Sequence, residues 1–161
     1  MLRRGSINRW LGGLALIVGL AAGCARQTVT AEDPSVPLSR FDGVSVGDFS
    51  TDAYLASIRG TPQYAPMLAV TSGANQTVRS AVLARLRGLR GDDNGPPLLL
   101  TAQLDDFDAR GGQGFMEYRV TLSTAGLPVA SYAVRREIMG GVKGAYEAEG
   151  DDIARYVVDH Q

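Results

Sequence analysis

Cysteine and histidine are almost absent from this chain of 161 residues, which contains one of each. With a single cysteine, Cys24, the chain cannot form an internal disulfide, and an odd cysteine in an exported protein must pair between chains, stay free or be modified. Zinc sites built from several cysteines and histidines are excluded by the same count. The one histidine, His160, lies one residue from the end, where a frayed terminus would hold a catalytic imidazole poorly. Thiol, zinc and Ser-His-Asp chemistry are therefore not expected.

A long apolar run and an excess of basic charge are also missing. A helix that spans a bilayer needs about 20 apolar residues, whereas the apolar run 10–22 has 13 residues and is followed by a polar segment. The whole chain carries a net charge of −1. A protein that binds nucleic acid usually carries a basic patch. Because this chain has no excess of basic charge, no nucleic-acid partner is expected.

The N-terminal segment has the three-part pattern of a secretory signal peptide. The first nine residues carry three arginines and no acid, the run 10–22 is apolar, and the small residues Ala21 and Gly23 lie at its end and directly after it. This order is typical of a cleaved export signal. An ordinary signal peptidase would also accept Ala21 and Gly23, so plain cleavage stays open as an alternative to modification.

The segment LAAGC at 20–24 resembles the lipobox of bacterial lipoproteins. The resemblance implies that cleavage falls between Gly23 and Cys24, and that Cys24 carries a diacylglyceryl group, often with a third acyl chain such as palmitate on its amine. Two or more chains anchor a protein stably, whereas one is marginal. Modification would also account for the odd cysteine. Ala25 stands where an aspartate is associated with inner-membrane retention, so the resemblance implies the periplasmic face of the outer membrane.

Removal of the signal peptide, residues 1–23, would leave 138 residues, enough for one domain. This part has 13 basic and 17 acidic residues, a net charge of −4. Residues 24–40 are predicted to be an acylated N-terminus and a flexible linker, because 27–40 is polar, contains two prolines and has no apolar period. Residues 41–161 are predicted to form a single periplasmic domain.

Apolar periodicity predicts the elements of that domain. Alternation predicts strands over 41–49, 98–107, 115–123 and 127–139, and apolar stripes predict helices over 75–90 and from Gly150 to His160. Ser72 and Asn75 are candidate N-caps of the first helix, and Asp151 and Asp152 suit the start of the last one. Segment 51–73 has no clear assignment. Within it, Tyr54, Leu55 and Ile58 could share one helical turn, which Gly60 and Pro62 would end, and 66–70 fits a short strand or a buried turn.

The order strand-helix-strand-strand-strand-helix predicts an α+β two-layer sandwich with a mainly antiparallel sheet. Residues 124–126 predict a three-residue hairpin loop with Gly126 in the left-handed region. That loop would pair residue 123 with residue 127 and would set Tyr118 opposite Tyr132. The apolar faces of the two strands coincide in this register.

Carboxylates are densest at Asp105, Asp106 and Asp108, with Asp92 and Asp93 nearby in sequence. Calcium takes about six to eight oxygen ligands at defined positions, and the spacing here is not that of an EF-hand loop. A strand end that runs into a solvated hairpin explains the cluster better. No metal site, no catalytic residue and no cofactor beyond the covalent lipid on Cys24 are therefore predicted.

Arg119 and Arg135 are candidate anion-binding residues. They would share the face of the paired strands away from the core, where guanidinium groups could bind phosphate or carboxylate. The alternative is a solvated sheet face on which Glu117 and Glu137 balance the charge.

The anchor, the linker and the order of elements are similar to those of a group of small Gram-negative lipoproteins, which includes the LPS-assembly lipoprotein and the auxiliary lipoproteins of ABC-type lipid transport. The resemblance covers most of 41–160 as topology and patterning, and no functional residue is carried over. It implies a non-enzymatic envelope lipoprotein that docks onto a partner protein, as an auxiliary subunit of lipid or LPS transport. Two alternatives remain, an anionic-lipid-binding module that uses Arg119 and Arg135, and a small periplasmic hydrolase that uses the aspartates.

Overall fold

The computed structural model describes residues 27–31, 36–89, 95–110, 113–139 and 142–161. The strands are β1 (Gln27–Ala31), β2 (Val44–Ser50), β3 (Leu98–Arg110), β4 (Gln113–Thr124) and β5 (Leu127–Met139). The helices are α1 (Asp52–Ser57), α2 (Tyr64–Leu86) and α3 (Val142–His160), and a 3₁₀ turn, η1, covers Leu38–Arg40. The predicted signal peptide and lipobox, including Cys24, fall outside the described residues. None of the helices that the structure describes has the length and apolarity needed to cross a membrane.

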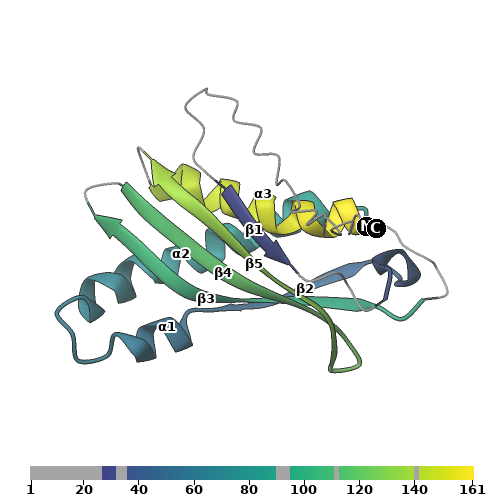
Figure 1. Cartoon of the computed structure of the whole chain (residues 1–161), viewed down its shortest axis with the longest axis horizontal. Coiled ribbons are helices and arrows are strands. Elements are labelled where there is room, and N and C mark those ends of the chain that lie inside the picture. Colours follow the sequence, from purple (N-terminus) through teal and green to yellow (C-terminus); the bar gives the residue numbers. More distant parts are fainter. Residues whose placement is uncertain (1–26, 32–35, 90–94, 111–112, 140–141) are drawn as a thin grey trace, which may run out of the picture.

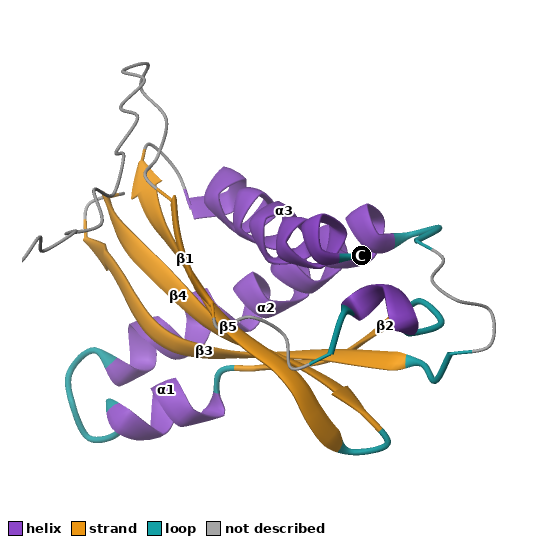
Figure 2. Ribbon diagram, turned by 45° about the vertical axis from the view of Figure 1, so that its right-hand side comes forward, coloured by secondary structure: helices purple, strands orange, loops and turns teal. Residues whose placement is uncertain are grey.

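The strands form one sheet in the order β1-β5-β4-β3-β2. All neighbours are antiparallel except β2 and β3, which run parallel. A parallel pair needs a crossover connection, and α1 and α2 supply it (Figure 1). Helices α2 and α3 lie side by side against one face of the sheet (Figure 2). This arrangement confirms the predicted α+β fold with a mainly antiparallel sheet.

The core lies between the sheet and these two helices. Val78 and Val82 of α2 and Ile153 and Val157 of α3 are fully buried, as the apolar stripes of the sequence predict. The strands contribute the alternating residues of one face, which are Leu98, Leu100, Leu104, Met116, Tyr118, Val120, Leu122, Tyr132, Val134 and Ile138. Burial of this apolar surface is the main driving force that holds the two layers together.

The hairpin between β4 and β5 differs from the prediction. Ala125 and Gly126 both have positive φ values, 48° and 79°, so the loop has two residues, with Thr124 paired to Leu127. A register shift between Leu122 and Ser123 adds a further residue to β5. Tyr118 therefore lies opposite Val134 and not Tyr132. The apolar faces of β4 and β5 still coincide, because the net shift of two residues equals the side-chain period of a strand.

Helix α2 begins eleven residues earlier than predicted, at Tyr64. The expected caps Ser72 and Asn75 lie inside this helix, and the segment 66–70 is helical, not a strand or buried turn. Pro66 lies in the first turn of α2, which tolerates it. A proline there removes only a backbone N–H that has no partner within the helix.

Helix α3 begins at Val142 and runs through Gly150, so the predicted start at Gly150 is wrong. Gly150 lies where α3 crosses α2. A Cβ atom at this position would come within 2.6 Å of the Val78 carbonyl oxygen and 2.5 Å of the Ala81 Cβ. Gly150 therefore permits the close approach of α2 and α3, and it does not mark a helix boundary.

The predicted linker, 24–40, contains ordered elements of the domain. Its residues Gln27–Ala31 form β1, and Leu38 is fully buried in the core. The prediction failed because four of the five side chains of β1 are exposed, so the strand has no apolar alternation. The domain therefore begins at least as early as Gln27.

Candidate functional site

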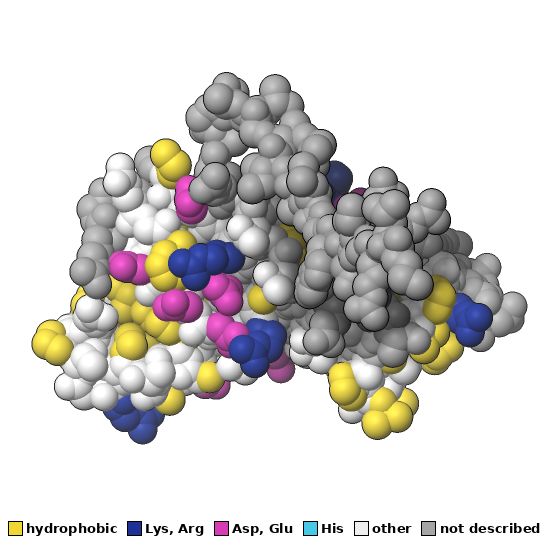
Figure 3. All heavy atoms as spheres, in the orientation of Figure 1, with side chains coloured by type: hydrophobic (Ala, Val, Ile, Leu, Met, Phe, Trp, Pro, Cys, Tyr) yellow, Lys and Arg dark blue, Asp and Glu magenta, His cyan; other side chains and the backbone are white. Residues whose placement is uncertain are grey.

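The two predicted anion-binding arginines lie on the sheet face away from α2 and α3. Arg119 Nη2 is 2.6 Å from an oxygen of Asp105, and Arg135 Nη1 is 3.0 Å from an oxygen of Glu117. The Arg135 guanidinium also stacks 3.6 Å above the ring of Phe115. Basic and acidic side chains accordingly stand beside one another on this face (Figure 3). Each arginine has a carboxylate partner, so a phosphate ligand would have to compete with it.

Two of the three aspartates in the predicted cluster make separate polar contacts. Asp105 pairs with Arg119, while one oxygen of Asp106 accepts a hydrogen bond from the Phe107 backbone N–H at 2.9 Å. Asp105, Asp106 and Asp108 line a groove of about 340 Å³ beside Tyr54. In the described part of the chain no group of three or more His, Cys, Asp or Glu side chains could hold a metal ion, and positions 92 and 93 lie outside that part.

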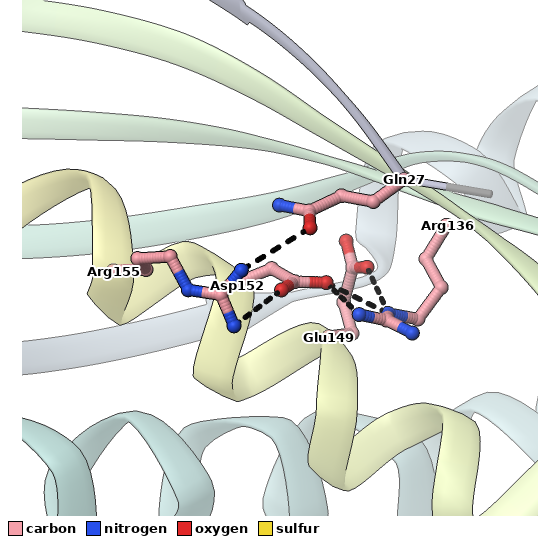
Figure 4. Close-up of polar contacts among 5 residues, drawn as sticks. All are labelled: Gln27, Arg136, Glu149, Asp152 and Arg155. Carbon is pink, nitrogen blue, oxygen red and sulfur yellow. Dashed lines mark hydrogen bonds and ion pairs between the residues drawn. The ribbon is translucent and has the colours of Figure 1, made fainter. Parts of the chain in front are cut away.

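The structure shows a buried ionic cluster that the sequence did not predict (Figure 4). Arg136 of β5 donates a 2.8 Å hydrogen bond from Nε to Asp152 of α3 and contacts the same oxygen through Nη2. Glu149 lies 4.0 Å from Arg136, and Arg155 lies 3.5 Å from Asp152. Arg155 also donates a hydrogen bond of 3.5 Å to the side-chain oxygen of Gln27. The cluster therefore ties α3 to both β5 and β1.

Two carboxylates share one partly buried arginine, Arg136, at the centre of this cluster. The side chains of Glu149 and Asp152 are fully buried, whereas Arg155 is about half exposed. Burial raises the pKa of Glu149 well above its usual value, and the nearby charge of Asp152 raises it further, while Arg136 lowers it. Neither oxygen of Glu149 has a hydrogen-bond partner among the described residues. These conditions favour a neutral Glu149 beside the ion pair of Arg136 and Asp152.

A signal for this cluster is present in the sequence. The core face of β5 alternates through Tyr132, Val134 and Ile138, and Arg136 stands between them on the same face. A charged residue on an apolar face requires a buried partner, and acids on the helix that follows are the nearest candidates in sequence.

His160 is also held more firmly than predicted. Helix α3 includes it, its ring stacks on Tyr156 with centroids 4.1 Å apart, and its Nδ1 lies 2.7 Å from the Tyr156 carbonyl oxygen. The expectation of a frayed terminus at His160 is therefore wrong.

The two edges of the sheet differ, and this contrast defines the candidate site. At the β2 edge, side chains of α2 donate to backbone carbonyls: Arg79 to Val46 and Gly47 at 3.0 and 2.8 Å, and Asn75 to Phe49 at 2.9 Å. At the other edge, β1 pairs with β5 on one side, and no described strand pairs with its outer side. Among the described residues, helix α2 thus covers part of the β2 edge, while no described strand covers the outer edge of β1.

A groove of about 410 Å³ runs between β1 and α3. We call it the edge groove. It is lined by Gln27, Val29, Ala31, Asp152, Arg155, Tyr156, Asp159 and His160. Val29, at the middle of β1, is 39% exposed. The open strand and the edge groove form one continuous surface with backbone hydrogen-bonding groups, apolar side chains and charges of both signs.

Comparisons with known proteins support the fold. No family model matches the chain, and no curated protein matches it. Two solved structures of PelC dodecamers from Paraburkholderia phytofirmans are similar to it. One is of a point variant, with a TM-score of 0.50 and 14% identity over 80% of this chain and 95% of that one. The other has a TM-score of 0.53 and 15% identity over 80% and 96%. At this identity the likeness concerns the fold alone.

Proposed function

We propose that this chain is a membrane-anchored envelope lipoprotein that serves as a non-enzymatic assembly subunit and docks onto further copies of itself along β1. The lipobox at 20–24 supports the anchor. The contrast between a covered β2 edge and an open β1 edge supports the docking. By the lipoprotein resemblance, the assembly serves lipid or LPS transport across the envelope.

The open edge carries the docking argument. An edge strand presents a row of backbone N–H and C=O groups that pair readily with another chain, and proteins that avoid such pairing place lysine, proline or a cover on the edge. The sequence of β1, QTVTA, has neither lysine nor proline. Its threonines and valine are β-branched residues that favour strands. The strand is therefore suited to the addition of a further strand from another chain.

A second copy is the occupant that the comparisons favour. Both similar solved structures are dodecamers, so this fold is compatible with assembly into many-subunit complexes. The rim of the edge groove offers a basic group, Arg155, and an acidic group, Asp159, one helical turn apart. Such mixed charge suits a surface that meets another copy with the same mixed composition.

The two alternative functions have less support. An anionic lipid headgroup bound at Arg119 and Arg135 would have to displace the carboxylates of Asp105 and Glu117. A hydrolase built on the aspartates would use Asp105, which is held by Arg119, and Asp106, which is held by a backbone N–H.

The test is the mass of the acylated protein in mild detergent, measured by light scattering after size exclusion. Lysines at Thr28 and Thr30, two exposed positions of β1, would place like charges against an incoming strand. The wild type is expected to form oligomers, and the double variant Thr28→Lys/Thr30→Lys is expected to be monomeric. Gln76→Lys, at an exposed position of α2, adds the same type of charge away from β1 and should leave the oligomer intact.

Three results would contradict the proposal. A wild type that stays monomeric at the highest soluble concentration would exclude self-assembly. Oligomers that persist in the double variant but dissociate in Gln76→Lys would move the interface from β1 to α2. A photo-crosslinker at Thr30 that joins β1 to a different envelope protein, in a monomeric wild type, would replace the second copy by that protein.

A further inference from the structure

The distance between the predicted anchor and the domain is short. Gln27, the first residue of β1, follows Cys24 by three residues. Consecutive Cα atoms are about 3.8 Å apart, so the Cα atoms of Cys24 and Gln27 lie within about 11 Å of each other in any conformation. An acylated Cys24 would therefore hold β1 close to the lipid surface, in place of the long tether that the sequence suggested.

The register of the sheet shows which end of the domain this tether reaches. Gln27 pairs with Arg136, and β5 continues for three more residues to Met139. At about 3.4 Å per residue, β5 extends about 10 Å beyond Gln27, nearly the full length of the tether. A tether extended along the strands therefore brings Cys24 level with Met139. The opposite end of β5, at Leu127, lies roughly 30 Å from the level of Gln27 along the strand.

The chemistry of the near end fits a bilayer surface. We define the anchor end as Gln27, Gln113, Met139 and Lys143. Gln113 pairs with Met139 at the start of β4, and Met139 is 59% exposed although it is apolar. Lys143, in the first turn of α3, is exposed. Met139 is an exposed apolar side chain and Lys143 is an exposed cation, the two kinds of group that meet acyl chains and anionic phosphates at a bilayer surface.

We infer that the anchor end is the membrane-facing end of the domain and that its partner is an anionic lipid bilayer, with Met139 at the acyl boundary and Lys143 at the phosphates. This inference rests on the proposed acylation of Cys24. In this orientation the strands run along the membrane normal, and the outer edge of β1 faces neighbouring molecules in the same membrane. Copies anchored in one membrane are related by rotation about its normal, so a neighbour's strand would run parallel to β1.

The test measures the depth of single fluorophores on the acylated full chain, in vesicles of phosphatidylethanolamine and phosphatidylglycerol that carry a nitroxide lipid. Acylation blocks the thiol of Cys24, the chain's only cysteine, so Met139→Cys and Leu127→Cys each provide one labelling site. Leu127, which is 69% exposed, is the matched control at the far end. We expect quenching of the label at position 139 to be several-fold stronger than at 127.

A flexible insertion of ten residues between Arg26 and Gln27 tests the role of the tether. It should reduce quenching at position 139 while the protein stays bound to the vesicles. Equal quenching at both labels would show a domain lying flat, and stronger quenching at 127 would show the opposite orientation. Either result overturns the inference and leaves the anchor standing. A mass spectrum with unmodified Cys24 would instead overturn the anchor, and with it the orientation.

Discussion

Replacing Glu149 with glutamine tests whether the buried carboxyl group makes the fold sensitive to pH. Its side chain is fully buried, and burial together with the charge of Asp152 raises its pKa well above the usual value. A raised pKa means that the folded chain keeps a proton that the unfolded chain has lost. The contribution of Glu149 to stability is therefore fully present below its unfolded pKa of about 4.3, and it is lost as the pH rises through the folded pKa.

The size of this loss follows from proton linkage. Between the unfolded and folded pKa values of Glu149, the free energy of unfolding falls by about 1.4 kcal/mol for each pH unit. Glutamine has nearly the same volume and does not titrate, so Glu149→Gln removes this slope. Near pH 4 we expect the variant to be no more stable than the wild type. At pH 8 we expect the variant to be the more stable protein.

Urea unfolding at steps from about pH 4 to pH 8 measures the difference between the two proteins. Glu147→Gln, at an exposed position of the same helix, is the matched control and should run parallel to the wild type. Parallel profiles for Glu149→Gln and the wild type would refute the reasoning, because Glu149 would then titrate alike in the folded and unfolded chains.

Three further substitutions test the packing and the edges. Gly150→Ala should lower the free energy of unfolding by about 1–3 kcal/mol because its Cβ would meet the backbone of α2, whereas Gly144→Ala, which has open space around it, should be neutral or stabilising in thermal melts. Asp152→Asn should cost up to about 3–5 kcal/mol by leaving Arg136 without its ionised partner. A cost below about 1 kcal/mol would contradict the pairing. Arg79→Leu should uncover two β2 carbonyls and increase self-association in light scattering, while unchanged association would show that Arg79 does not protect that edge.

The sequence predicts well those parts of the fold in which one pattern dominates. The bounds of β5 and the alternating faces of β4 follow from period-2 burial, and the buried stripe of α2 follows from the 3.6-residue period. These elements bury one face against a common core, so their sequences carry the signal.

The parts that the sequence misses are those set by tertiary context. β1 exposes most of its side chains, so only its pairing with β5 reveals it as a strand. Gly150 interrupts a helical pattern in sequence, yet its role is the close contact with α2. The shift between Leu122 and Ser123 depends on backbone geometry that no side-chain pattern specifies.

The candidate site shows the same division. Arg119 and Arg135 could be placed on one face by alternation, but their carboxylate partners could not be assigned without the register. Arg136 and Asp152 stand on the apolar faces of β5 and α3, whereas the sequence pattern assigns Asp152 only to the start of the last helix. The open edge of β1 is a property of the sheet order, which the residues of the strand do not reveal on their own.

Membrane anchoring through Cys24 is tested most directly by the intact mass and the membrane fractionation of the wild type beside Cys24→Ser. We expect the wild type to begin at Cys24, to carry the added mass of its acyl chains, and to sediment with the membranes. The variant should lack this mass and should be released from the membranes. A soluble, unmodified wild type with a free or intermolecularly bonded Cys24 would contradict the lipoprotein assignment.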